Sequence, residues 1–287
     1  MTVHVALRHV THYKYDRAVA LGPQIVRLRP APHSPTPVLG YALKVTPADH
    51  AIDWQCDAHG NQVAHLTFAH PADELTIEVE LTAAMTEPGP APQATAAGAG
   101  AAPVPALAPY LHQPPATARL QKYLETLPRH TTPPLDFVAG LAGRLRHELR
   151  YLVREAPGVQ TPEETLERAS GSCRDFAWLL VQLLRRRGLA ARFVSGYLIH
   201  LEAGNLAAAG AAGNTADLHA WCEVYLPDAG WVGVDPSMGG FAGAGYIPLA
   251  VGATPEDTAP VTGYTEKSGV ELGYEMRVMR LAGTPGA

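Results

Sequence analysis

Alternation between apolar and polar residues dominates the first 85 residues of the chain. The segment TVHVALRHVTHYKY at 2–15 repeats every second residue, and ELTIEVELTAAM at 74–85 does so more regularly. A period of two puts alternate side chains on opposite faces of a β-strand. Shorter strand-like segments between them are separated by prolines and by the turn DAHGNQ at 57–62. We therefore predict an antiparallel β-sandwich domain over residues 1–85.

The pattern is lost over residues 86–118. This stretch consists almost entirely of Pro, Ala and Gly. Such a composition buries too little apolar surface to fold by itself, so we predict an extended linker. Tyr110 and Leu111 are large apolar residues within it that could dock onto a neighbouring surface.

From residue 119 onwards the apolar positions first follow a helical spacing and then a strand spacing. ARLQKYLETL and LDFVAGLAGRLRHELRYL carry apolar residues at steps of three and four. Three strand-like segments come later: ARFVSGYLIHL, HAWCEVYLP and WVGVDPS. The short turn PDAG joins the last two into a hairpin. The order predicts an α+β core over 119–287, with a central helix packed on an antiparallel sheet.

Composition and charge exclude several classes of function. A formal net charge of −5 gives no general attraction to nucleic acid or to anionic membranes. The sequence contains no apolar run of membrane-spanning length, and its first residues lack the hydrophobic core of a secretion signal. The three cysteines show no CxxC spacing, which argues against a disulfide framework or structural zinc. We therefore expect a cytoplasmic protein with free thiols.

One cysteine lies at a predicted helix start, in GSCRDFAWLL at 171–180. Ser172 and Asp175 have the spacing of a capping box, so Cys173 occupies the first helical position. Exposed backbone N–H groups and the positive end of the helix dipole favour a thiolate there. Cys173 is thus a candidate nucleophile. The alternatives are a buried structural cysteine and, for Asp175, a purely structural role as a cap.

A cysteine nucleophile needs a base and a group that orients the base. Among thirteen histidines, His219 is distinguished by opening a strand on which it shares one face with Trp221. Cys222 lies on the opposite face, where we expect it to be core. Asp235 ends the paired strand and would lie near His219, although an Asp followed by Pro is equally typical of a turn.

The predicted site therefore consists of Cys173, His219 and Asp235. The backbone N–H of Cys173 would supply half of an oxyanion hole. Three residues are candidates for the second donor: Tyr151, Gln160 and Trp221. A metal enzyme is a weaker alternative, because the His9 and His12 pair lies on a strand pattern and points to opposite faces. We expect no cofactor and no metal.

Several of these stretches resemble a known family. GSCRDFAWLL, ARFVSGYL, DLHAWCEVYLPDAGWVGVDPS and PLAVG resemble the core of the bacterial transglutaminase-like superfamily. HYKYDRAVALGPQIVRLRP and DAHGNQVAHLTF resemble the β domain that precedes this core in one bacterial branch. The resemblance implies a papain-like triad at Cys173, His219 and Asp235. Trp178 and the turn Ser237-Met238-Gly239 depart from the usual pattern, which points to an altered substrate.

The triad and the resemblance together predict an amide-bond enzyme working through a cysteine thioester. We expect hydrolysis of a peptide, isopeptide or glutamine carboxamide. The alternatives are a protein-glutamine transamidase and a non-catalytic peptide-binding protein whose groove would be walled by Trp178, Trp221 and Trp231. The resemblance implies an ATP-grasp-type ligase as a partner besides the peptide or protein substrate. No acidic calcium loop is present in the sequence.

Overall fold

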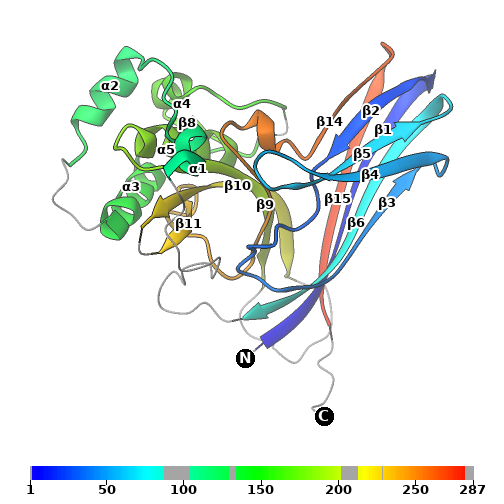
Figure 1. Ribbon diagram of the computed structural model, residues 1–287, viewed down its shortest axis with the longest axis horizontal. Coiled ribbons are helices and arrows are strands. Elements are labelled where there is room, and N and C mark those ends of the chain that lie inside the picture. Colours follow the sequence, from blue (N-terminus) through cyan, green and yellow to red (C-terminus); the bar gives the residue numbers. More distant parts are fainter. Residues whose placement is uncertain are drawn as a thin grey trace.

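The computed structural model describes residues 2–86, 104–128, 134–154, 156–201, 213–227 and 229–281. A strand-rich part and a mixed part lie side by side (Figure 1). The predicted α+β architecture, an antiparallel β-sandwich with a mixed core, is confirmed.

The sandwich consists of two four-stranded antiparallel sheets. The first has the order β15 (Val270–Arg280), β1 (Thr2–Val19), β6 (Ala72–Thr86) and β3 (Val38–Thr46). The second has the order β14 (Val261–Thr265), β2 (Leu21–Val26), β5 (Gln62–Phe68) and β4 (His50–Cys56).

The alternating pattern of the sequence corresponds to the observed faces. In β6, Leu75, Ile77, Val79 and Leu81 are all buried. In β1, Val5 and Leu7 join the same apolar cluster. This cluster includes Tyr197 and Ile247 of the core sheet, so the sandwich packs directly against that sheet.

The two C-terminal strands depart from the predicted division at residue 119. We assigned 119–287 to the core, but β15 pairs with β1 and β14 pairs with β2, so both complete the sandwich. Alternation in this region identifies strands, but it carries no information about which distant strand they pair with. Residues of both chain ends thus form neighbouring strands (Figure 1).

The core contains five antiparallel strands with helices packed against them. The sheet order is β12 (Gly240–Phe241), β11 (Gly230–Asp235), β10 (Thr215–Leu226), β9 (Ala191–His200) and β13 (Tyr246–Gly252). The helices are α1 (Val104–Leu111), α2 (Ala118–Glu125), α3 (Pro134–Glu148), α4 (Pro162–Arg168), α5 (Cys173–Arg185) and the 3₁₀ turn η1 (Glu256–Thr258). Two short parallel strands, β7 (Arg150–Tyr151) and β8 (Ser170–Gly171), precede α5.

Helix α5 is the predicted central helix, and its apolar side packs on the sheet. Phe176, Leu179 and Leu183 belong to one buried cluster with Cys222 and Val224 of β10. Cys222 is fully buried, as expected for a core cysteine. Burying both faces of α5 fixes its first residue relative to the sheet.

Part of the predicted linker is ordered. Residues 87–103 lie outside the described residues. Residues 104–111 form α1, a helix that the prediction of an extended linker did not include. Tyr110 is buried, its hydroxyl lies 2.9 Å from Nδ1 of His59, and its ring meets Trp231 edge-on. The expected docking of Tyr110 is thus confirmed.

Within the described ranges, no helix is both long enough and apolar enough to cross a bilayer.

Candidate active site

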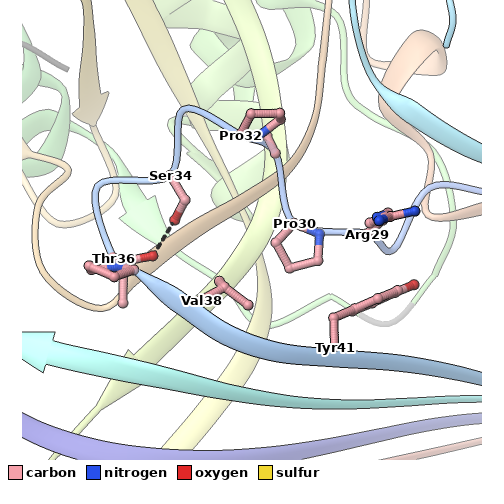
Figure 2. Close-up of a pocket in the computed structure, with 9 residues that line it drawn as sticks. Arg29, Pro30, Pro32, Ser34, Thr36, Val38 and Tyr41 are labelled. Atoms are coloured by element: carbon pink, nitrogen blue, oxygen red, sulfur yellow. Dashed lines mark hydrogen bonds between the residues drawn. The ribbon is translucent and has the colours of Figure 1, made fainter. Parts of the chain in front are cut away.

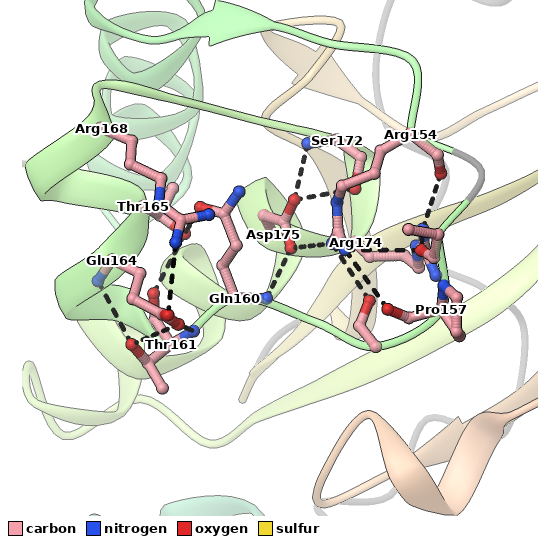
Figure 3. Close-up of polar contacts among 12 residues, drawn as sticks. Arg154, Pro157, Gln160, Thr161, Glu164, Thr165, Arg168, Ser172, Arg174 and Asp175 are labelled. Carbon is pink, nitrogen blue, oxygen red and sulfur yellow. Dashed lines mark hydrogen bonds and ion pairs between the residues drawn. The ribbon is translucent and has the colours of Figure 1, made fainter.

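The start of α5 is held by the predicted cap and by further contacts. Asp175 is fully buried, and its Oδ2 accepts hydrogen bonds from the backbone N–H (2.7 Å) and the hydroxyl (2.9 Å) of Ser172. Its Oδ1 accepts from Nη2 of Arg154 and from the backbone N–H of Gln160, both at 2.7 Å (Figure 3). The capping role of Asp175 is confirmed, and the same carboxylate also ties the 154–160 loop to the helix. Cys173 therefore begins a rigid helix.

Arg174 holds the same loop from the other side. Its Nη2 donates to the carbonyl oxygens of Arg154 (2.8 Å) and Ala156 (3.0 Å). The residue after the cysteine is thus used to fix the neighbouring backbone. Sequence patterns offered no signal for this contact, because Arg154 lies some twenty residues earlier in the chain.

The environment of Cys173 favours its thiolate. The side chain is largely buried, and this burial alone would raise the pKa of the thiol. The pKa is nevertheless lowered, because the His219 side chain hydrogen-bonds the sulfur and contributes positive charge, and the backbone of Ala220 adds a hydrogen bond. Cys222 shows the opposite behaviour, since complete burial raises its pKa.

His219 and Asp235 are brought together as the sequence predicted. Nε2 of His219 lies 2.7 Å from Oδ2 of Asp235, and both side chains are buried. Cys222 pairs with Val234, so one step further along the hairpin Trp221 lies opposite Asp235 and His219 lies diagonally to it. Residue 228 of the PDAG turn is outside the described residues. Because Nε2 is bonded to Asp235, the hydrogen bond of His219 with Cys173 is assigned to Nδ1.

The pair is strongly polarised. Burial lowers the pKa of His219, but hydrogen bonds with Asp235 and Cys173 outweigh it and raise the pKa to about 10. Burial likewise raises the pKa of Asp235, but the hydrogen bond and charge of His219 lower it overall. The shifts of His219 and Cys173 both favour an imidazolium beside a thiolate.

Asp235 also has the turn-forming role that is typical of an Asp followed by Pro. Its Oδ1 accepts from the backbone N–H (2.8 Å) and hydroxyl (2.6 Å) of Ser237 and from the backbone N–H of Met238 (3.2 Å). One oxygen therefore fixes the turn while the other serves His219. The Ser237-Met238-Gly239 turn therefore fixes the carboxylate that contacts His219.

Sequence reasoning missed Tyr246. This residue begins β13 and is buried, and its hydroxyl donates to Oδ2 of Asp235 at 2.9 Å. Its aromatic ring also contacts those of His219 and Trp221. Tyr246 follows a glycine-rich stretch without any motif, so only the three-dimensional pairing of β13 with β9 reveals it.

The structure separates the three candidates for a second oxyanion donor. Tyr151 is the candidate that interacts with Cys173. Burial is the largest cause that raises the pKa of the tyrosine hydroxyl, and the charge of Cys173 and a hydrogen bond with it raise this pKa further. Gln160 is buried, with its carbonyl oxygen accepting from Thr165 at 3.4 Å. Trp221 is buried and stacks on His219. Its burial also removes Trp221 as a wall of an open peptide groove.

The residues considered for a metal site are spread apart. His9 is fully buried, with Nδ1 2.9 Å from the Tyr197 hydroxyl, whereas His12 lies beside Glu74 at 3.1 Å. Burial lowers the pKa of His9 to about 4, so it is neutral. Across the described part of the chain, no group of three or more His, Cys, Asp or Glu residues is arranged to hold a metal ion.

A cavity of about 290 Å³ lies in the sandwich rather than at the triad (Figure 2). Pro30, Pro32 and Val38 contribute apolar walls, and Tyr41 and Arg29 close one end. The Arg29 guanidinium lies 5.8 Å from the centre of the Tyr41 ring. The lining includes none of Cys173, His219 and Asp235.

Comparisons with known proteins agree with this geometry. Residues 5–84 match the bacterial transglutaminase-like N-terminal region, and residues 121–236 match the transglutaminase-like superfamily. The first match lies in the sandwich, and the second contains all three triad positions.

Similar proteins cover different shares of the chain. An uncharacterised Mycobacterium tuberculosis protein, Rv2569c, is 26% identical over 96% of this chain and 92% of its own length. A protein-glutamine gamma-glutamyltransferase of Pseudomonas aeruginosa is 35% identical over 36% of this chain but only 16% of its own length. A crystal structure from Cytophaga hutchinsonii, described as a candidate cysteine protease, matches with a TM-score of 0.65 at 16% identity and covers 98% of both chains. At that identity the structural match shows the fold.

Proposed function

Because the chain belongs to the transglutaminase-like superfamily and carries the bacterial N-terminal region before the core, we propose that it is a cysteine-dependent amide-bond enzyme. The observation that carries this proposal is the contact of one imidazole with both Cys173 and Asp235 at a capped helix start. Cys173, His219 and Asp235 would act as nucleophile, acid–base and orienting carboxylate.

In the first half-reaction the Cys173 thiolate attacks the carbonyl carbon of an amide. The carbonyl π electrons move to oxygen, and a tetrahedral oxyanion forms. When this intermediate collapses, the C–N bond breaks and the imidazolium of His219 gives its Nδ1 proton to the leaving nitrogen. An amine or ammonia departs, and a thioester to Cys173 remains.

In the second half-reaction water attacks the thioester carbonyl. Neutral His219 takes one proton from the water, the C–S bond breaks, and the carboxylic acid product leaves. The thiolate and the imidazolium are restored together. Hydrolysis is the proposed outcome because it needs no acceptor other than water.

The oxyanion would be stabilised by two donors. The backbone N–H of Cys173 belongs to the first turn of α5, whose N–H groups have no partners within the helix. The Tyr151 hydroxyl, which interacts with Cys173, would supply the second. Its raised pKa keeps the hydroxyl protonated, as a donor requires.

Exposed apolar side chains near the triad support a peptide-like substrate. Leu152 and Val153 follow Tyr151 and are 36% and 86% exposed, while Met238 beside Asp235 is 56% exposed. The backbone N–H of Leu152 donates to Gly171 at 2.8 Å, which places this segment next to the nucleophile. Apolar surface of this kind favours an extended chain over a small polar amide.

Transamidation is the second candidate. The similarity to the Pseudomonas protein-glutamine gamma-glutamyltransferase over 109 residues favours it. Here an amine would replace water in the second half-reaction. The triad is the same in both cases, so the acceptor has to be determined by experiment.

The test is one incubation of glutamine peptides, isopeptides and a primary amine, analysed by mass spectrometry. We expect glutamate or cleaved isopeptide as product from wild type and from Cys56→Ala, and no product from Cys173→Ala. Amine-linked peptide would instead establish the transamidase. Peptide binding unaffected by Cys173→Ala, without turnover of any amide, would overturn the proposal in favour of a binding protein.

We propose that the protein works in the cytoplasm, because all three cysteines are free thiols. An ATP-grasp-type ligase stays a proposed partner, since it would supply amide bonds of the kind that this site would cleave.

A further inference from the structure

Tyr246 and His219 both contact the same carboxylate oxygen of Asp235. Oδ2 of Asp235 receives the Tyr246 hydroxyl at 2.9 Å and lies 2.7 Å from Nε2 of His219. With Ser237 and Met238 on Oδ1, both oxygens of this buried carboxylate are hydrogen-bonded. The carboxylate therefore cannot rotate without breaking one of these contacts.

The ring of Tyr246 also restrains the imidazole directly. It meets His219 edge-on, with ring centres 6.3 Å apart, and meets Trp221 at 5.2 Å. Trp221 in turn stacks on His219 with an angle of 26° between the planes. A Cβ on Gly196 would lie 2.4 Å from the Trp221 ring, so glycine is required beneath this aromatic layer.

A loop of the sandwich fixes the residue before Tyr246. The backbone N–H of Gly245 donates to Oγ1 of buried Thr36 at 3.1 Å. Gly245 has a φ of 93°, and a Cβ there would lie 2.5 Å from the carbonyl oxygen of Ile199. The entry to β13 is therefore set by backbone geometry and by Thr36.

The loop that carries Thr36 is itself anchored. The Ser34 hydroxyl donates to the Thr36 carbonyl at 2.7 Å (Figure 2). The backbone N–H of Ala31 donates to the carbonyl of Pro248 in β13, also at 2.7 Å. This loop of the sandwich thus contacts the backbone on each side of Tyr246, at Gly245 and at Pro248.

We propose that Tyr246 is a positioning residue of the triad and that Thr36, through Gly245, makes this positioning depend on the N-terminal sandwich. The sandwich would then do more than support the core, because it would set the orientation of the carboxylate that holds His219. The proposal deepens the proposed function and rests on it in one respect, namely that His219 activates Cys173.

Among the described residues, the titratable groups that face the imidazole are Cys173 of α5, Asp235 of β11 and Tyr246 of β13. Tyr151 of β7 faces the sulfur, and the charge of Asp217 on β10 acts on Tyr151. Removing the Tyr246 hydroxyl would leave His219 as the one remaining described partner of Oδ2 of Asp235, so the geometry of the contact between carboxylate and imidazole would be less constrained. The imidazolium would then be less favoured, and the thiolate of Cys173 would form only at higher pH.

The experiment measures the rate of Cys173 alkylation against pH in the full chain, without any amide substrate. For Tyr246→Phe we expect the acid limb of the profile to move up by about one pH unit, which corresponds to a rate about tenfold lower on that limb. Thr36→Val should move it in the same direction, and Thr36→Ser, which keeps the hydroxyl, should restore the wild-type profile.

Tyr110→Phe is the matched control, because it removes another buried hydroxyl contact with the sandwich, the one with His59, and this contact involves none of Cys173, His219 and Asp235. Its profile should remain that of wild type. Superimposable profiles for Tyr246→Phe and wild type would overturn the proposal. If the profiles shift but no amide is turned over, the positioning stands and the proposed function fails. If amides are turned over but no profile shifts, the proposed function stands and the positioning role of Tyr246 fails.

Discussion

The side chain of Asp175 occupies the space that a side chain on Gly171 would need. A Cβ on Gly171 would lie 2.7 Å from Cβ of Asp175 and 3.0 Å from its Oδ2. This space belongs to the carboxylate that caps the helix and binds Arg154.

Gly171→Ala should therefore weaken both the fold and the nucleophile. We expect a loss of about 1–3 kcal/mol in the free energy of unfolding, as for other overpacked sites, and slower alkylation of Cys173. Urea unfolding and thiol labelling measure the two effects. Gly140→Ala in α3 is the control, because its Cβ would meet nothing within 4 Å, and it should be neutral or stabilising. Equal effects of the two substitutions would contradict the steric explanation.

The three cysteines should differ sharply in reactivity. We expect a small alkylating reagent near pH 7 to modify Cys173 about tenfold or more faster than exposed Cys56, because only Cys173 has a histidine partner. Cys222, fully buried with a raised pKa, should react only on unfolding. Peptide mapping after timed quenching gives all three rates in one sample. Equal rates for Cys173 and Cys56 would contradict an activated thiolate.

The pH dependence of turnover should show two limits. The rate should rise as pH increases through the lowered pKa of Cys173, where the thiolate forms. It should fall above about pH 10, where His219 loses the proton that the leaving group needs. Alkylation, which needs no acid, should keep its plateau there. His219→Ala should move the acid limb of alkylation to at least the ordinary thiol value of about 8.5.

The same shifts predict how stability depends on pH. The raised pKa of His219 means that its contribution is complete below the unfolded value near 6.5 and is lost as pH rises through about 10. The lowered pKa of Asp235 means that its contribution is present above about pH 4 and is lost at lower pH. The midpoint temperature of thermal unfolding of wild type should therefore fall at both the acid and the alkaline end of this pH range. His219→Ala should remove the alkaline decline that belongs to this residue.

Local rules predicted the parts of the site that are local in sequence. The capping box placed Cys173 at a helix start, and the period of two separated His219 from Cys222. The hairpin brought His219 and Asp235 to one end of the sheet. Each of these relationships spans fewer than about twenty residues, over which turn and strand geometry constrain the chain.

The parts that were missed depend on long-range pairing. Arg154 reaches Asp175 only because β7 and β8 pair, and Tyr246 reaches Asp235 only because β13 joins β9. Strands β14 and β15 pair with β2 and β1, which belong to the other end of the chain. A hydrophobic period determines which face is buried, and many pairings satisfy it equally well.

A buried ion pair on β10 provides a test of stability away from the triad. Glu223 is 4% exposed, and its Oε2 lies 2.6 Å from Nη2 of Arg192. The guanidinium also lies 4.1 Å from the centre of the Trp231 ring. Burial raises the pKa of Glu223, but Arg192 and His33 outweigh it and lower the pKa to about 2. The pair remains ionised at every pH at which the triad would work.

Glu223→Gln should destabilise the protein strongly, because Arg192 would stay buried without a counter-charge. We expect a loss of about 3–5 kcal/mol in the free energy of unfolding at pH 7, measured by urea denaturation. Glu80→Gln, which removes an exposed partner of Lys44, should cost less than about 1 kcal/mol. Lowering the pH from 4 towards 2 should reduce the difference between wild type and Glu223→Gln, since the wild-type contribution is present above the unfolded pKa of about 4.3 and is lost as Glu223 protonates. The double substitution Arg192→Met with Glu223→Leu should regain much of the lost stability, because it removes both charges and keeps apolar volume. If the double variant is as unstable as Glu223→Gln, packing rather than the unpaired charge governs this site.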